Sequence, residues 1–490
     1  INLPDSSNGI YQVGTITAAV GTNITFTSNN IINQVGAINL LANTTANAAN
    51  IIYDTTTGTK GSNITGGAVT IGSGLNSSAI NYIAKSLGSA INPGAIGSSS
   101  VALPGYILVD NTYGCTGSSC TPVTAHISAA ANNLVAKATT SVGITINGVM
   151  YANSAITING ASNSTYGISA SADITSKNGD VTLNGSTVAS IGVYVTAANI
   201  VTGNNITING ASISAPSWVT QIGALKINTT SVGGNIVVTG NVIGTPGAAG
   251  GIYQIGNING ANGSNISFIS NNDISQSGAL ILVANTSGSA ANITFDTTTG
   301  DKTSSIVSGA LTIAASTSTS AINFIEKSAG ASLNPGAIGT SAVNLPGYLL
   351  IDNTFGCSGS GCTPVTGFIN ATTPNLTTLA TASIGATINA AIFTTGNITI
   401  NAASNTNRGI DASVNITSTN GNVVLNGATV STIGVYVAAA NTVTGNNITI
   451  NGTATSASVS WVNQIAAMTI NSAAVGGSIT VSGNVVGIPG

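Results

Sequence analysis

The chain has 490 residues, a net charge of −3 and 4% charged residues, whereas an average globular protein has about 25%. Eight Lys and Arg residues over this length cannot neutralise a run of phosphates, so nucleic acid is not expected as a partner. No uninterrupted apolar stretch of about 18 residues is present, so no transmembrane helix is expected. Asn, Thr, Ser and Gly must therefore solvate the surface, and the 42% of hydrophobic residues suffices for a long, thin core.

A long internal repeat divides the chain. The segment Gly251–Gln254 repeats Gly9–Gln12 at an offset of 242 residues, and the cysteines and the pairs Asp110/Asp352 and Lys85/Lys327 keep this offset. We therefore predict two tandem homologous units, residues 1–247 and 248–490.

The two ends of the sequence lie at the same phase of this repeat. Ile1–Pro4 and Val486–Gly490 both align with the segment Ile243–Gly247. This phase predicts either a window of a longer tandem array or a subunit that joins head to tail with its neighbours.

Short strand-like stretches follow one another through each unit. Early examples begin at Ile24, Ile38, Ile51 and Val69, where apolar and polar residues alternate.

Further along, a five-residue pattern of apolar, Thr, apolar, Asn and Gly recurs at Ile156–Gly160 and Ile206–Gly210. We expect its Asn-Gly pair to turn the chain through positive φ angles. A coil of roughly 20 to 30 residues holding two or three short strands is typical of a parallel β-solenoid. A β-sandwich would also bury alternate residues, but it does not explain the recurrence.

Two segments are ambiguous between helix and strand. Residues 78–87 and 320–329 carry apolar residues near helical spacing, for example Ile80, Ile83 and Leu87. Each predicts either a short helix laid on the solenoid or another strand.

Four cysteines form the strongest local signal. Cys115 and Cys120 enclose four small residues, as do Cys357 and Cys362, and such loops allow a disulfide within each pair. A metal site would need further ligands, and the only histidine is His126. We therefore predict two local disulfides and no metal or cofactor, with each bond stapling a protruding turn. Disulfides imply an oxidising, extracytoplasmic compartment.

Four charged residues of the first unit recur in the second without forming an obvious catalytic pair. The recurring residues are candidates to meet in space, and they are Asp54, Lys60, Lys85 and Asp110, repeated as Asp296, Lys302, Lys327 and Asp352. A surface ion pair or an Asp closing a turn explains them more simply than acid–base catalysis, which needs paired groups in a cleft. We do not expect an enzyme.

Two further groups of residues are candidate surface sites. Acceptor sequences for N-glycosylation occur at Asn23, Asn163, Asn205, Asn228 and Asn397, although several asparagines are also expected in stacked turn ladders. Tyr113 and Phe355 lie beside the cysteine loops and form a possible contact loop, and packing on the neighbouring coil explains them equally well.

The strings Asn-Gly-Asp-Val-Thr-Leu-Asn-Gly185 and Gly-Asn-Asn-Ile-Thr-Ile-Asn-Gly210 resemble the filamentous-haemagglutinin-type and autotransporter-passenger adhesins of Gram-negative bacteria. The resemblance implies a long right-handed β-solenoid, exported to the cell surface, that mediates adhesion or builds fibres. No recognisable secretion domain accompanies it here.

Together these features predict an all-β, mostly parallel β-solenoid of two tandem units. The expected function is a structural segment of an extracellular or cell-surface filament that joins with copies of itself. The alternative is an adhesin whose protruding loops bind glycans or receptors on a host or neighbouring cell. A third class, the ice- or polysaccharide-binding solenoid, needs a flat Thr-x-Thr face in register on successive coils, and the uneven strand spacing argues against it.

Overall fold

The computed structural model describes most of the chain. The residues outside the described part are 1–7, 20, 42–48, 59–60, 73–79, 87–89, 116–118, 215, 229–232, 245–249, 262, 284–290, 301–303, 314–321, 329–331, 344, 358–361, 382, 457–460, 472–475 and 487–490. The chain divides into two compact units, residues 1–228 with 237–245 and residues 229–236 with 246–490.

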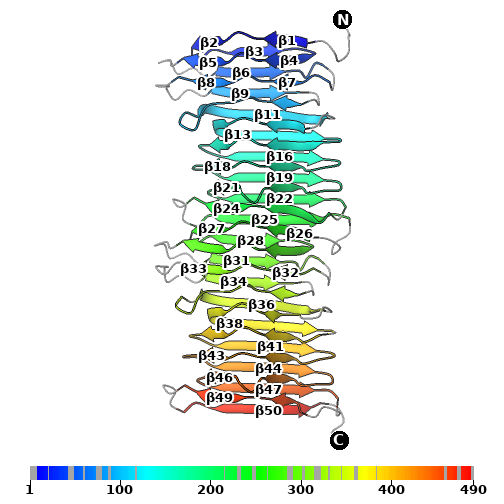
Figure 1. Ribbon diagram of the computed structural model, residues 1–490, viewed down its shortest axis with the longest axis vertical. Helices are drawn as coiled ribbons and strands as arrows, with labels where there is room; N and C mark the ends of the chain where they lie inside the picture. The colour runs from blue at the N-terminus through cyan, green and yellow to red at the C-terminus, as the bar shows by residue number, and fades with distance from the viewer. Residues whose placement is uncertain are drawn as a thin grey trace. The chain divides into compact units, whose positions relative to one another are not determined.

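Each unit is a parallel β-solenoid, as the sequence predicted, and no helix occurs among the described residues. A coil consists of three strands, such as β16 (Ile156–Ser162), β17 (Ile168–Ala170) and β18 (Ile174–Ser176). The next coil stacks on it in parallel register, and Ile156 pairs with Val181, 25 residues later. Figure 1 shows these strands stacked within each unit.

The first unit has a long sheet on one side and shorter sheets on the other two. The long sheet contains, in order of pairing, β3 (Ile24–Thr27), β6 (Ala49–Asp54), β9 (Ile80–Lys85), β11 (Leu103–Cys115), β13 (Ile127–Ala138), β16, β19 (Val181–Thr187) and β22 (Ile206–Ser212). The second side contains β2 (Ile16–Ala19), β5 (Ile38–Leu41) and β8 (Val69–Ile71), then β15 (Met150–Ala152), β18, β21 (Ile200–Gly203) and β24 (Ala224–Ile227). The third side contains β1 (Asn8–Gln12), β4 (Ile31–Gln34), β7 (Ile64–Thr65) and β10 (Ile91–Asn92), then β12 (Ser119–Val123), β14 (Val142–Ile146), β17, β20 (Val193–Val195) and β23 (Trp218–Ile222).

The second unit has the same three sides. Its long sheet contains β28 (Asn265–Ile269), β31 (Ala291–Asp296), β34 (Ile322–Lys327), β36 (Leu345–Cys357), β38 (Ile369–Ala380), β41 (Ile398–Ser404), β44 (Val423–Thr429), β47 (Ile448–Ala454) and β50 (Ile479–Val485). The second side contains β27 (Ile258–Ala261), β30 (Leu280–Val283) and β33 (Leu311–Ile313), then β40 (Ile392–Thr394), β43 (Ile416–Ser418), β46 (Thr442–Gly445) and β49 (Ala467–Ile470). The third side contains β26 (Gly250–Gln254), β29 (Asp273–Gln276), β32 (Ile306–Val307) and β35 (Leu333–Asn334), then β37 (Pro364–Val365), β39 (Ala386–Ile388), β42 (Ile410–Ala412), β45 (Val435–Val437) and β48 (Asn463–Gln464). The remaining strand, β25 (Asn235–Val242), has residues in both units.

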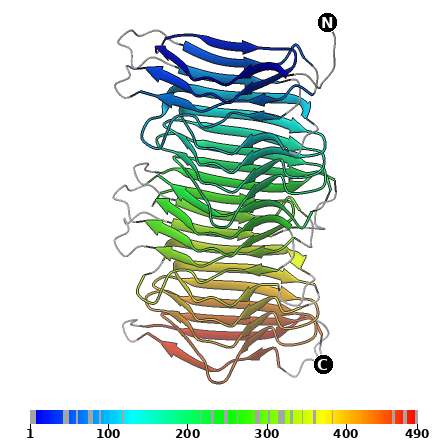
Figure 2. The same ribbon diagram turned by 45° about the horizontal axis from the view of Figure 1, so that its top comes forward.

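Strand alternation decides which side chains enter the core. In β16, Ile156 and Ile158 point inward and are fully buried, whereas Thr157 and Asn159 point outward and are half-buried. Because residues of the same type recur one coil later, apolar residues stack on apolar residues along the interior. Figure 2 shows the strands from a second angle, with the turns at the corners of the coils.

The prediction that Asn-Gly turns the chain is wrong. β16, β19 and β22 continue through this pair, and Gly160 is not among the described glycines with positive φ. Gly is needed at Gly160 because a Cβ there would lie 2.2 Å from the backbone oxygen of Gly167 on the facing side of the coil. The glycine thus permits a close approach of two backbones within an extended strand.

The described parts of the two ambiguous segments contain the strands β9 and β34, and Leu87 lies outside the described residues. In β9, Ile80, Tyr82 and Ala84 are inward and fully buried, so the period of two applies rather than the helical period. Tyr82 continues an internal aromatic stack, in which the ring centroids of Phe26 and Tyr53 are 5.0 Å apart and those of Tyr53 and Tyr82 are 5.2 Å apart. The second unit repeats this stack with Phe268, Phe295 and Phe324.

Candidate functional site

The outer face of the long sheet brings the recurring charged and amide residues together. In the first unit, one outward-facing residue per coil forms a single in-register line, which we call the outer column. The outer column consists of Asp54, Lys85, Asp110, Val135, Asn159, Asn184 and Asn209. The second unit has a matching outer column of Asp296, Lys327, Asp352, Thr377, Asn401, Asn426, Asn451 and Ser482.

The charged part of the column contains a turn-closing aspartate. The backbone N–H and the hydroxyl of Thr56 donate to Asp54 Oδ1 at 2.8 and 2.6 Å. Asp296 accepts the same two bonds from Thr298. Lys85 pairs in register with both Asp54 and Asp110, so opposite charges alternate along the column. Lys60 and Lys302 lie outside the described residues.

The amide part of the column is a hydrogen-bonded ladder. Asn184 Nδ2 donates to Asn159 Oδ1 at 2.8 Å, and Asn209 Nδ2 donates to Asn184 Oδ1 at 2.8 Å. In the second unit, Asn426 and Asn451 donate in the same direction at 2.8 and 2.9 Å. All amides are therefore oriented alike, with their N–H groups toward the earlier coil. The sequence predicted asparagines in stacked turn ladders. This ladder is present, but it lies in the strands β16, β19 and β22 rather than in turns.

Both predicted disulfides are present, and their position differs from the expectation. Cys115 bonds to Cys120 and Cys357 to Cys362, with Cα–Cα distances of 5.5 and 5.6 Å. All four cysteines are fully buried rather than at the tip of a protruding turn. The first bond joins the long sheet to the third side of the coil, because β11 ends at Cys115 and Cys120 lies in β12. The second joins the end of β36 at Cys357 to the bend before β37.

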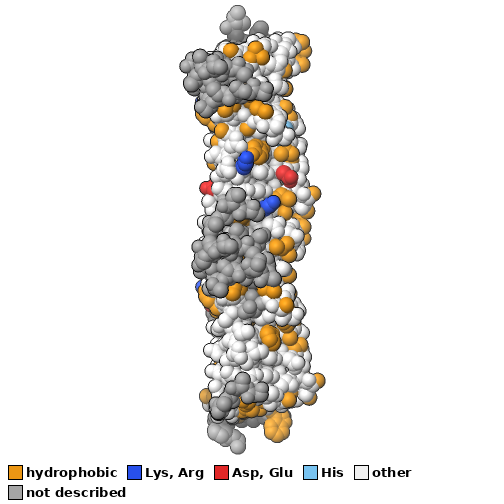
Figure 3. Space-filling view, turned by 90° about the vertical axis from the view of Figure 1, so that its left-hand side faces the viewer, with side chains coloured by type: hydrophobic (Ala, Val, Ile, Leu, Met, Phe, Trp, Pro, Cys, Tyr) orange, Lys and Arg blue, Asp and Glu red, His pale blue; other side chains and the backbone are white. Residues whose placement is uncertain are grey.

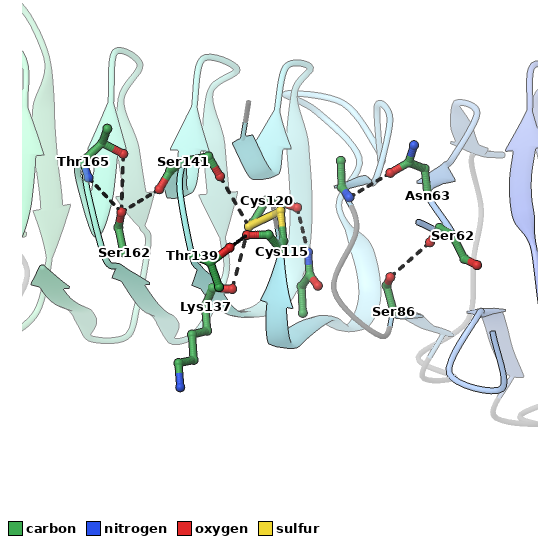
Figure 4. The surroundings of a disulfide bond; sticks show 12 residues. Ser62, Asn63, Ser86, Cys115, Cys120, Lys137, Thr139, Ser141, Ser162 and Thr165 are labelled. Atoms are coloured by element: carbon green, nitrogen blue, oxygen red, sulfur yellow. Dashed lines mark hydrogen bonds between the residues drawn. A yellow bond between two sulfur atoms is a disulfide. The ribbon is translucent and has the colours of Figure 1, made fainter. Parts of the chain in front are cut away.

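The surroundings of the first disulfide are polar backbone and hydroxyl groups (Figure 4). The backbone N–H and hydroxyl of Thr139 donate to the carbonyl of Cys115 at 2.8 and 2.9 Å, and Asn111 Nδ2 donates to the carbonyl of Cys120 at 2.9 Å. The side chain of Lys137 points away from the sulfur atoms. The disulfide thus closes a corner of the core, and both of its cysteines are fully buried.

The five glycosylation candidates differ in the hydrogen bonds that their side-chain amides make. Asn228 Nδ2 donates to Ser176 O, Lys177 O and Asn204 Oδ1, each at 2.9 Å, so attaching a glycan would break this network. Asn205 Nδ2 donates to Asp180 Oδ1 at 2.8 Å.

The other three candidates are exposed and keep Nδ2 outside the described hydrogen bonds. Asn23 and Asn397 use Oδ1 to accept the backbone N–H of the next coil, at 2.9 Å each. Asn163 lies at the turn after β16, and none of the described hydrogen bonds involves its side chain. Of the five, Asn163 is the best placed acceptor. The side chains of Tyr113 and Phe355, the predicted contact loop, lie outside the described part.

One titratable residue in the core was not expected from the sequence. Glu326 points inward from β34 and is fully buried, and neither carboxyl oxygen has a well-formed hydrogen bond among the described residues. Burial raises the pKa of the Glu326 carboxyl to about 8, and the Ser308 hydroxyl lowers it by a smaller amount. The equivalent residue of the first repeat is Ala84. A charged residue in one repeat where the other repeat has an apolar residue was the sequence signal for this buried carboxyl.

Few other features of the molecule point to chemistry. Among the described residues, His, Cys, Asp and Glu form no group of three or more that could hold a metal ion. The same part of the chain contains no helix long and apolar enough to cross a membrane. On the face drawn in Figure 3, charged side chains are few and separated by uncharged ones. Comparison with models of known protein families gives no match, and comparison with curated proteins gives none either.

Proposed function

We propose that this chain is a structural segment of an extracellular, cell-surface filament, in which solenoid coils continue from one unit into further units of the same kind. The observation that supports this most strongly is the parallel stacking of the long sheet within each unit, in which the β11–β13 and β36–β38 pairs contain register shifts and the other neighbouring pairs named above are in continuous register. Interior strands of the long sheet, such as β44 and β47, pair in parallel with both the coil before and the coil after, so a further coil can add without changing the pattern.

The coil formed by β49 and β50 carries a surface suited to such addition. Ile479 and Val481 of β50 occupy inward-facing positions, yet they are 43% and 45% exposed. At the equivalent positions of the preceding strand β47, Ile448 and Ile450 are fully buried. One more coil would cover these side chains and pair the open strand edge, which is otherwise prone to association.

The location follows in part from the cysteines. Two buried disulfides indicate an oxidising, extracellular environment. Display at the cell surface, and kinship with the filamentous-haemagglutinin-type adhesins, are part of the proposal. The low charge supports it, because hydroxyl and amide groups rather than ions solvate the molecule.

We propose a non-enzymatic role. The carboxylates of the outer column alternate with lysines or close turns, and this arrangement suits surface stabilisation rather than general acid–base catalysis. Adhesion through the cysteine loops has no support from described side chains, so we do not favour it over the filament.

Electron microscopy of the purified chain tests the proposal. We expect rods in end-to-end contact, and a sedimentation profile that shifts to larger species as concentration rises. Ile479→Asp with Val481→Asp should abolish this shift, because charges at inward positions cannot be buried under a further coil. Thr480→Asp changes the outward residue between them and serves as the matched control.

Two results would contradict the filament. One is a wild-type chain that stays monomeric at all concentrations and shows no end contacts. The other is assembly that survives the double variant unchanged, which would mean that the β50 surface is not the joint.

A further inference from the structure

The outer face of the long sheet in the first unit is hollowed next to the amide ladder. One hollow of about 400 Å³ lies over β13, β16, β19 and β22, and it is lined in part by Asn159, Asn184 and Asn209. A second, of about 350 Å³, lies over β11, β13 and β16 beside Tyr106, Asn133 and Thr157. Residues 133 and 135 of β13, and 157 and 159 of β16, are successive outward positions, so the two hollows adjoin. Figure 1 shows these strands stacked in this order. We call the combined surface the amide groove.

The lining of the amide groove is nearly uncharged. Small residues such as Ala161 and Ala211 provide methyl groups, and the only charged side chain among the described residues that line either hollow is Lys137. A methyl-rich floor suits the C–H face of a sugar ring. A single lysine excludes a polyanion such as a nucleic acid as the natural occupant, because such a ligand requires many cations.

The ladder leaves hydrogen-bonding capacity directed at the groove. Each side-chain amide has two N–H groups and two acceptor sites, and the ladder uses one of each at Asn184. Asn159 begins the ladder opposite Val135, which has no polar side chain, and Asn159 Nδ2 donates to no group in the described part of the chain. Successive amides are one strand spacing apart, about 4.8 Å. The groove therefore offers donors and acceptors at a fixed repeat, which matches a repetitive polymer of hydroxyl groups.

An aromatic ring lies at the other end of the groove. Tyr106 faces outward from β11 and is 42% exposed. Its register partner on β13 is Ala131, so the small neighbour does not cover the ring. Exposed Tyr combines a flat apolar face with a polar hydroxyl, a combination that recurs at binding surfaces.

We propose that the amide groove binds an extended, uncharged polysaccharide chain. The sugar rings lie on the methyl-rich floor, one ring stacks on Tyr106, and ring hydroxyls bond to the free amide groups of the ladder. A peptide strand is a poorer fit, because strand addition needs an open sheet edge and this groove lies on a sheet face whose backbone groups are paired.

The structure also removes the objection that strand spacing is too uneven for a polysaccharide-binding face. Thr157, Thr182 and Thr207 lie in register on three successive coils, each two residues before an Asn of the ladder. The repeated outward motif is thus Thr-x-Asn rather than Thr-x-Thr. This inference is independent of the proposed filament, since the groove and the β50 surface are different parts of the molecule.

Affinity electrophoresis of the full chain tests the proposal, with gels that contain soluble uncharged polysaccharides: a β-glucan, a galactomannan, a xylan and hydroxyethyl cellulose. We expect at least one to retard the wild-type chain. Tyr106→Ala, and Ala161→Trp, which fills the groove, should each weaken binding at least tenfold. Tyr166→Ala removes a similar ring from the corner between β16 and β17, away from the groove lining, and is the control. Thermal unfolding of each variant verifies that it is folded.

Four outcomes would overturn the proposal. The first is no retardation by any of these polymers. The second is equal retardation of the wild type and both groove variants. The third is stronger retardation in a parallel gel that contains a sulfated polysaccharide, lost when salt is added, which would indicate charge attraction at Lys137. The fourth is displacement of the polysaccharide by an extended peptide or by a second copy of the chain.

Discussion

The guanidinium of Arg408 lies over the ring of Tyr436, with 3.9 Å between Cζ and the ring centroid. Arg408 Nη1 also donates to Asp411 Oδ2 at 2.7 Å. One repeat earlier, Tyr166 and Tyr194 occupy the equivalent positions, and their rings stack with centroids 5.3 Å apart. Both repeats therefore place a flat group on the tyrosine of the following coil, although that group is an arginine in one repeat and a tyrosine in the other. The register of the coils preserves the contact.

Replacing Arg408 by Ala should destabilise this coil locally, by about 0.5–1 kcal/mol, the usual size of an exposed cation–π contact. Arg408→Tyr restores a stacked pair like that of the first repeat and should recover most of the loss. Hydrogen exchange of the β42 and β45 amides measures the effect. Equal protection in the Ala and Tyr variants would show that stacking contributes nothing here.

Stability should fall as pH rises between about 4.5 and 8 because of Glu326. Its carboxyl has an ordinary pKa of 4.5 and a folded-state pKa of about 8, so the folded chain keeps a proton that the unfolded chain releases. Below pH 4.5 both states are protonated and the cost vanishes. At pH 8 the cost is on the order of 4 kcal/mol.

Glu326→Gln should therefore stabilise the second unit at pH 8 and leave it nearly unchanged at pH 4. Denaturant unfolding at both pH values provides the comparison. Glu326→Ala recreates the residue at Ala84 of the first repeat and gives an independent variant. If the wild type and both variants showed the same pH dependence, the carboxyl would be ionised in the fold at neutral pH.

Gly185→Ala should destabilise the first unit by about 1–3 kcal/mol through overpacking. A Cβ at Gly185 would lie 2.0 Å from the backbone oxygen of Gly192, and that backbone cannot move away like a flexible side chain. Gly14→Ala is the matched control, since a Cβ at Gly14 would have no described atom within 4 Å. The midpoint of thermal unfolding distinguishes the two, and equal midpoints would contradict the close approach.

Asn184→Ala should cost about 1–3 kcal/mol, because it removes two ladder hydrogen bonds worth about 0.5–1.5 kcal/mol each. Asn163→Ala removes an exposed amide outside the described hydrogen bonds and should be neutral. Hydrogen exchange of β16, β19 and β22 locates the loss. Uniform protection across these strands would show that water replaces the ladder at no cost.

Much of the fold follows from local patterns in the sequence. Alternation of apolar and polar residues, as at Ile156–Ile158, determined the strands and their inward faces, because side chains of a strand point to opposite sides in turn. The recurrence of such units at coil spacing determined the parallel solenoid. The short spacing of Cys115 and Cys120 determined the disulfide, because a sequence separation of five residues keeps the two thiols near each other.

Only the tertiary structure decided which residues of different coils meet. Asp110 and Asn159 belong to one outer column because coil lengths set the register, and coil length depends on corners that no short pattern encodes. The same holds for Gly160, whose role comes from a backbone on the facing side rather than from its own φ angle. The ladder, the amide groove and the surroundings of the buried Glu326 all form where residues of different coils meet. Local sequence determines what each strand presents, and stacking determines which groups it meets.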